Sequence, residues 1–151
     1  MKTIEYQTMD KSGWGPGPWM HEPDKKQWND PTTGLPCLIV RNQLGALCGY
    51  VGVSRAHPDF ERDYDNVEVR VHGGLTFANH CRPGPEDASI CHLVEDGEDD
   101  HVWWLGFDCA HCDDEVPGNT FMRWGGLYRD FDYVSREVTH LASQLKARGE
   151  A

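Results

Sequence analysis

The feature that most constrains the fold is an apolar pattern near the C-terminus. Apolar side chains recur there at intervals of three and four residues, at Phe131, Val134, Val138, Leu141 and Leu145. This spacing predicts an amphipathic helix with a single apolar face, which Asp130 or Asp132 can cap at its start. Such a helix has to bury its apolar face against another layer, so the upstream residues must supply that layer.

Short apolar runs separated by turn residues fill the middle of the chain and predict strands. Residues 37–41 and 46–53 are expected to pair as a hairpin around 42–45, and 67–71 alternates valine with charged residues. Further strands are expected at 75–78, 90–94 and 102–109, the last being the most apolar and central one. The sequence therefore predicts an α+β fold, a mostly antiparallel sheet of about five or six strands with the C-terminal helix packed on it.

Glycine, proline and tryptophan crowd the first 34 residues, which read GWGPGPW over 13–19. This composition predicts an irregular arm over 1–34, followed by a single α+β domain over 35–151. The tryptophans at 14, 19 and 28 are expected to pack on that domain, because large aromatic side chains mainly serve burial. The alternative is an aromatic lid over a site.

The charge of the chain bears on its partners. It has 14 basic and 25 acidic residues and a formal net charge of −11, which argues against long nucleic acid as a partner. A small anion in a local basic pocket stays compatible with this charge, and so does an acidic surface that imitates nucleic acid. No apolar run approaches the roughly 20 residues of a membrane span, so we expect no membrane partner. The expected location is the cytoplasm, with all six cysteines reduced.

The run Cys109-Ala110-His111-Cys112 is the clearest candidate for metal binding. Its two cysteines have the C-x-x-C spacing at which two thiolates reach one zinc ion, and His111 lies between them. The remaining ligands would come from His80-Cys81 or Cys91-His92. The alternative is that Cys109 is a buried strand residue, because free cysteine behaves as a small apolar side chain. Acidic neighbours disfavour a thiolate and hence a redox motif.

His72-Gly73-Gly74 is the second candidate site. Two glycines after a strand allow the backbone to approach a ligand closely, and His72 could act there as a base or a ligand donor, although a hairpin turn explains the glycines equally well. Arg70 and Trp104 would complete a ligand-binding set with these three residues, and Trp103 should point to the opposite sheet face from Trp104. The other cations considered for an anionic ligand are Arg41, Arg82 and Arg123.

Several segments resemble a family of small uncharacterised proteins encoded by bacteriophages and prophages. The resemblance covers residues 35 to 145, and its most specific strings are HGGLT over 72–76 and GFDCAH over 106–111. A small residue usually stands in that pattern where this chain has Cys112, which weighs against a zinc site shared by the family. The resemblance implies a phage accessory protein that acts in the cytoplasm of a bacterial host.

Three functions follow as expectations from this setting and from the residues. The first is a binding module that sequesters a small anionic, nucleotide-like ligand or a host defence protein, and it fits the absence of a P-loop or a nucleophile-elbow motif. The second is a metal-dependent or Cys/His hydrolase that uses the central polar residues His72, His80, Cys109 and His111. The third is an acidic decoy for a nucleic-acid-binding host protein.

Overall fold

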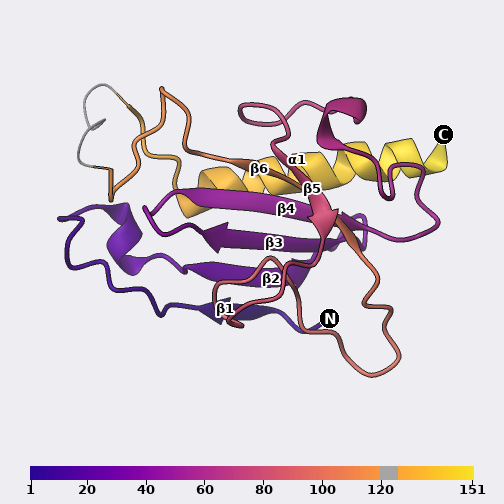
Figure 1. Cartoon of the computed structure of the whole chain (residues 1–151), viewed down its shortest axis with the longest axis horizontal. Coiled ribbons are helices and arrows are strands. Elements are labelled where there is room, and N and C mark those ends of the chain that lie inside the picture. The colour runs from indigo at the N-terminus through magenta and orange to yellow at the C-terminus, as the bar shows by residue number, and fades with distance from the viewer. Residues whose placement is uncertain (120–125) are drawn as a thin grey trace.

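An antiparallel sheet and one long helix form the frame of the protein (Figure 1). The computed structural model describes residues 1–119 and 126–151, and within them the sheet has six strands in the order β1-β2-β3-β4-β6-β5. The strands are β1 (Ile4–Tyr6), β2 (Lys25–Asn29), β3 (Pro36–Arg41), β4 (Leu47–Val53), β5 (Phe77–His80) and β6 (Trp103–Asp108). The helices are the short η1 (Pro18–His21) and η2 (Tyr64–Asn66) and the long α1 (Phe131–Glu150). The predicted α+β class is confirmed.

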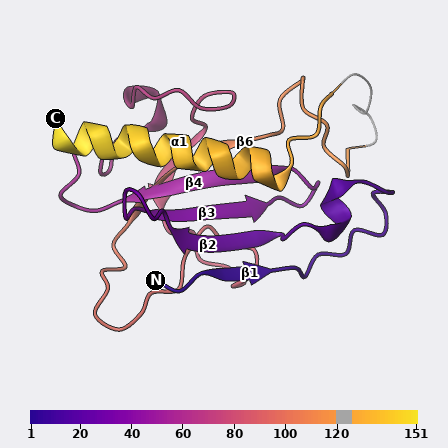
Figure 2. The same cartoon turned by 180° about the vertical axis from the view of Figure 1, so that it is seen from behind.

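One face of the sheet packs against α1, which Figure 2 shows in front of the sheet and running roughly along β4. The apolar residues of α1 join alternate residues of the strands in one buried cluster, which includes Ile39, Leu47, Val51, Leu105, Phe107, Val134, Val138, Leu141 and Leu145. Gly49 makes this close approach feasible, because a Cβ atom there would meet the side chains of Phe107 and Val138. The helix begins after Asp130, whose carboxylate accepts a hydrogen bond from the Tyr133 amide at 2.8 Å.

The opposite face carries a second, smaller core. It comprises Leu38, Val40, Cys48, Tyr50, Val102 and Trp104, with Phe77 and Ile90 packed against it. The chain that follows β5 crosses this face, on the other side of the sheet from α1 (Figure 1). The two cores therefore follow from strand alternation, since successive side chains point to opposite faces.

Two of the predicted strands are wrong. The backbone of 67–71 bonds to side chains of α1, where the Arg70 amide donates to Gln144 at 2.7 Å and the Arg70 carbonyl accepts from it at 2.8 Å. In 90–94, Ile90 forms an isolated bridge to Arg82, and Leu93 bonds to the Gln27 side chain. Both segments have strand-like composition, but side chains of another element take up their backbone hydrogen bonds.

The prediction that residues 1–34 are irregular is wrong for β1 and β2. The five residues of β2 pair along their whole length with β3, yet they read KKQWN and lack an apolar alternation. The reason is that Lys25 and Gln27 occupy the inward positions as buried polar residues. Trp19 is buried, as expected for a packed arm.

The expectation that all six cysteines are reduced is also wrong, because Cys81 and Cys91 form a disulfide. The other four, Cys37, Cys48, Cys109 and Cys112, are free. Within the described residues, no helix is long and apolar enough to cross a membrane.

Candidate functional site

Three segments far apart in the sequence meet at the start of α1 and bring polar side chains together. They are the turn at 71–74, the loop 109–114 that follows β6, and the first turns of the helix. A parallel bridge between Asp114 and Leu127 brings the chain that leads into α1 beside this loop. The turn, the loop and the helix supply His72, His111 with Asp114, and Tyr133 respectively.

The turn at 71–74 sets the position of His72. The Gly74 amide donates to the Val71 carbonyl at 2.9 Å, and Gly73 and Gly74 have φ values of 67° and 79°. Positive φ is a conformation that glycine adopts without strain. Gly73 has a second role, because a Cβ atom there would collide with the imidazole of His111. The two glycines therefore form a turn, although not the predicted hairpin because 67–71 is not a strand, and Gly73 also makes room for a side chain of the site.

Asp114 is the centre of the cluster, and its side chain is fully buried. Its Oδ2 atom lies 3.0 Å from His72 Nε2 and 3.2 Å from His111 Nδ1, and it also accepts from the His111 amide at 3.0 Å. Its Oδ1 atom lies 3.0 Å from the same His72 nitrogen and accepts from Arg129 Nε at 2.9 Å. His72 thus lies equally close to both oxygens, while His111 contacts Oδ2 and Arg129 contacts Oδ1.

The surroundings keep Asp114 ionised. Burial by itself raises the pKa of this carboxyl, but the hydrogen bonds from His72, a backbone amide and Arg129 outweigh burial and leave the pKa below its usual range. The same bond raises the pKa of Arg129. The cluster therefore contains a fixed negative charge beside a fixed positive charge.

The second ring nitrogen of His72 is held as well. Its Nδ1 atom lies 2.8 Å from the Tyr133 hydroxyl, and the His72 amide donates to Glu137 at 2.8 Å. Burial and then the Glu137 carboxylate raise the pKa of Tyr133, so the hydroxyl keeps its proton at neutral pH. Both ring nitrogens of His72 have partners, and the ring is fixed in orientation.

His72, His111 and Asp114 form a set of ligands that fits a metal ion. One donor atom from each lies within 4.8 Å of the other two. Two donors about 2.1 Å from a shared ion at a tetrahedral angle lie about 3.4 Å apart, close to the 3.0 and 3.2 Å separations around Asp114 Oδ2. The other such group in the described residues, Asp99, Asp100 and His101, consists of three exposed residues. His111 also lines a hollow of about 140 Å³ with Cys112 and Asn119, which gives the cluster a path to solvent.

The predicted zinc set is not brought together as such. His111 belongs to the cluster, but Cys109 and Cys112 do not share a ligand group with it. Cys109 is buried, and burial raises the pKa of its thiol well above the usual range, which also argues against a cysteine nucleophile. Cys112 is exposed, with Sγ 3.6 Å from the Asp113 carboxylate. The auxiliary ligands His80, Cys81 and Cys91 lie elsewhere, the two cysteines in the disulfide and His80 beside Glu61.

The residues predicted to bind a ligand together do not all lie in one place. His72 and Gly73 lie at the cluster, and Gly74 completes their turn. Trp104 is fully buried in the core of the opposite sheet face, so it does not share a site with His72. Arg70 is exposed, and it attaches its segment to α1 through its backbone.

The arginines proposed to bind an anionic ligand differ in whether their guanidinium groups are already bonded within the protein. All three guanidinium nitrogens of Arg41 are bonded to Glu22, Asp24, Gly45, Tyr128 and Pro23, so Arg41 serves the structure. Arg82 lines a groove of about 470 Å³ with Tyr50 and Gly84 on the face opposite α1. Arg123 lies outside the described residues.

Sequence reasoning missed Asp114, Arg129 and Tyr133. The local signal for Asp114 was its place three residues after His111, the separation at which a loop carboxylate can meet a histidine. No local signal connects these residues to His72, which is 42 positions before Asp114. Comparison of the chain with protein-family models, with curated proteins and with solved structures found no match to any of them.

Proposed function

We propose that this protein binds a divalent transition-metal ion through His72, His111 and Asp114 and uses the bound ion for hydrolysis. The observation that supports the proposal is the convergence of two imidazoles on one buried carboxylate oxygen, at 3.0 and 3.2 Å. Two histidines with one carboxylate are a ligand set used by catalytic metal sites, which leave positions open for water or substrate. The phage setting is compatible with such an enzyme.

The residues around the set supply what a catalytic ion needs. If Nε2 of His72 held the ion, its ring proton would sit on Nδ1 and would donate to the Tyr133 hydroxyl oxygen, which lies 2.8 Å away. Arg129 donates to Asp114 Oδ1, and Oδ2, which also accepts from the His111 amide, would be the oxygen offered to the ion. An ion held there would supply a water of lowered pKa as the nucleophile for hydrolysis.

Titration of the chelator-treated protein with cobalt(II) and zinc tests the metal site. We expect one equivalent to bind, with visible cobalt bands and no thiolate charge-transfer band, because the ligands are nitrogen and oxygen. His72→Ala and Asp114→Asn should abolish binding, while Cys112→Ser and the exposed helix variant His140→Ala should bind normally. Circular dichroism confirms that each variant is folded. Loss of binding in Cys112→Ser, or no binding by the wild type, would overturn the proposed site.

The reaction class has a separate test. Hydrolysis of p-nitrophenyl acetate and p-nitrophenyl phosphate is compared for apo protein, zinc-loaded protein and zinc-loaded His140→Ala. We expect hydrolysis in both zinc-loaded samples and none in the apo protein. Stoichiometric zinc without any zinc-dependent turnover of either ester would leave the metal site standing and contradict hydrolysis of these two ester classes.

The groove beside Arg82 supports a second candidate function, the binding of a small anionic, nucleotide-like ligand. Tyr50 and Phe77 form an edge-to-face pair at 5.3 Å on this side of the sheet, and Tyr50 lines the groove with Arg82 and Gly84. An aromatic side chain, a cation and glycine backbone are suitable contacts for such a ligand. Isothermal titration with cyclic mono- and dinucleotides tests this function, and binding that survives Arg82→Ala would contradict the groove as the site.

A further inference from the structure

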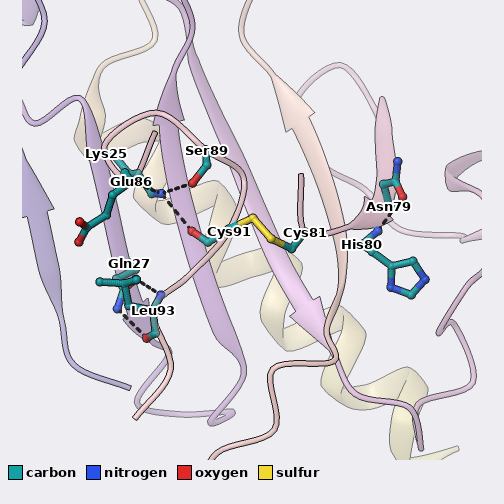
Figure 3. The surroundings of a disulfide bond; sticks show 9 residues. All are labelled: Lys25, Gln27, Asn79, His80, Cys81, Glu86, Ser89, Cys91 and Leu93. Atoms are coloured by element: carbon teal, nitrogen blue, oxygen red, sulfur yellow. Dashed lines mark hydrogen bonds between the residues drawn. A yellow bond between two sulfur atoms is a disulfide. The ribbon is translucent and has the colours of Figure 1, made fainter. Parts of the chain in front are cut away.

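A buried lysine lies on the sheet face opposite α1, outside the proposed metal site. The Nζ atom of Lys25 donates to the Glu86 carbonyl at 2.6 Å, to the Cys91 carbonyl at 3.0 Å and to the Ser89 hydroxyl at 3.2 Å (Figure 3). The Glu86 side chain turns to the Tyr6 hydroxyl at 2.6 Å instead. Among the described residues, no carboxylate lies within 4.0 Å of this amine, so neutral oxygens of one loop surround it.

The Cys81–Cys91 disulfide closes the loop that covers Lys25. It joins the chain just after β5 to a residue ten positions later, across the face of the sheet (Figure 3). Gln27, two residues along β2 from Lys25, holds the Leu93 amide at 2.8 Å and the Leu93 carbonyl at 3.2 Å. Residues 82–86 of the loop are exposed, so apart from Ile90 and Ser89 the loop has little buried surface to hold it closed. The covalent bond therefore acts together with the hydrogen bonds from Lys25 and Gln27 to hold the loop closed.

We propose that the disulfide gates Lys25, so that reduction by a dithiol opens the loop and exposes the amine to small aldehydes. In the first step, the Cys81–Cys91 bond takes two electrons and two protons from the dithiol, which becomes a disulfide itself. In the second step, the neutral amine adds to the aldehyde carbon, and loss of water leaves an imine at Lys25. The amine releases its own proton to solvent before it attacks.

The surroundings of Lys25 suit this chemistry. Burial lowers the pKa of Lys25 to about 8, although the Glu86 and Asp87 charges oppose the shift, so a share of the amine is neutral near physiological pH. A hollow of about 270 Å³ lies beside it, lined among others by Cys81, Cys91 and His92. This space accommodates a small aldehyde once the loop has moved.

Reductive methylation with formaldehyde and cyanoborohydride tests the gate, with methyl groups located by peptide mapping. The samples are the oxidised protein and the Cys81→Ser/Cys91→Ser variant, which stands for the open state without a thiol reductant that would consume formaldehyde. We expect Lys25 to be methylated at least about tenfold faster in the variant, because local opening controls the labelling of a buried group. Lys26 is the matched control, because it is the next residue on β2, is partly exposed and faces the other side over Trp28.

Two results would overturn the proposal. One is equal methylation of Lys25 in the two samples. The other is a variant in which Lys26 methylation and hydrogen exchange of α1 rise together with Lys25, because the disulfide would then hold the whole fold rather than a gate. Cobalt binding at His72 is measured on the same samples, so failure of the metal site and failure of the gate are distinguished.

Discussion

Asp114 illustrates how a buried charge is tolerated at the level of a single residue. Its two carboxylate oxygens accept hydrogen bonds from a backbone amide and Arg129 and contact His72 and His111. Transfer of a charged group from water to the protein interior costs free energy unless such partners replace the lost water. Trp104 shows the opposite case, because its buried indole nitrogen has no hydrogen-bond partner among the residues that the structure describes.

Asp114→Asn should lower the free energy of unfolding by about 2 kcal/mol at pH 7, because charged hydrogen bonds are replaced by neutral ones. The pKa of Asp114 is lower in the folded protein than in the unfolded chain, so its contribution is complete above about pH 5 and is lost as pH falls through the folded pKa. Urea unfolding from pH 7 to pH 3 should therefore show the gap between wild type and variant closing in acid. Asp132→Asn, an exposed change on α1, should stay within about 0.5 kcal/mol throughout. A gap that stays constant down to pH 3 would contradict the assigned bonds.

At the scale of elements, the start of α1 links the fold to the candidate site. Asp130 caps the helix by accepting from the Tyr133 amide, and Tyr133 in turn holds the ring of His72. The Phe131 amide belongs to the first turn and has no acceptor within the helix. It donates to the Glu22 carboxylate at 2.8 Å. The helix terminus is thus fixed by the segment that precedes it and by the N-terminal region.

Asp130→Ala should cost about 1 kcal/mol of stability, because the side-chain acceptor at the helix start is lost. Asp130→Asn keeps a side-chain oxygen at the cap and should recover most of that loss. Thermal unfolding followed by circular dichroism measures both variants. If the asparagine variant is as unstable as the alanine variant, the carboxylate acts through its charge and not as a cap.

At the scale of the whole molecule, a buried ionic network attaches the N-terminal region to the sheet and to the chain leading into α1. Arg41 on β3 bonds to Asp24 at 3.0 Å and to the Tyr128 hydroxyl at 2.8 Å. Lys11 reaches the same Asp24 oxygen at 2.8 Å. Burial raises the pKa of Asp24, but the bonds from Lys11 and the backbone and the charge of Arg41 outweigh it, so the carboxylate is ionised.

Arg41→Met should lower the free energy of unfolding by about 3 kcal/mol, because the buried Asp24 and the half-buried Glu22 lose their shared partner while Lys11 still contacts Asp24. Limited proteolysis should then cut first between residues 8 and 22, which the network holds in place. Arg136→Met, an exposed change on α1, is the matched control and should cost less than about 0.5 kcal/mol. Proteolysis that begins in α1 instead would show that the network stabilises the fold as a whole and not the N-terminal region.

The elements that the sequence predicts correctly are those with a local pattern. The helix over 131–150 follows from spacings of three and four residues, and the hairpin of β3 and β4 follows from apolar runs around a turn. The sequence also indicated His72 and the turn at Gly73 and Gly74, because the chemistry of histidine and the preference of glycine for positive φ are properties of single residues. The local pattern did not predict β2, because the inward-facing residues of this strand are polar and it therefore shows no apolar alternation.

The tertiary structure decided which distant residues meet. Three long-range contacts have no local sequence signal. They are the contact of Asp114 with His72, the disulfide between Cys81 and Cys91, and the burial of Lys25 under a loop. The physical reason is that periodicity records which face of an element is buried, whereas the partners across that face depend on sheet order and on how the loops cross it. The amino-acid sequence by itself therefore determined the helix and most of the sheet, and the tertiary structure determined which residues meet in its candidate sites.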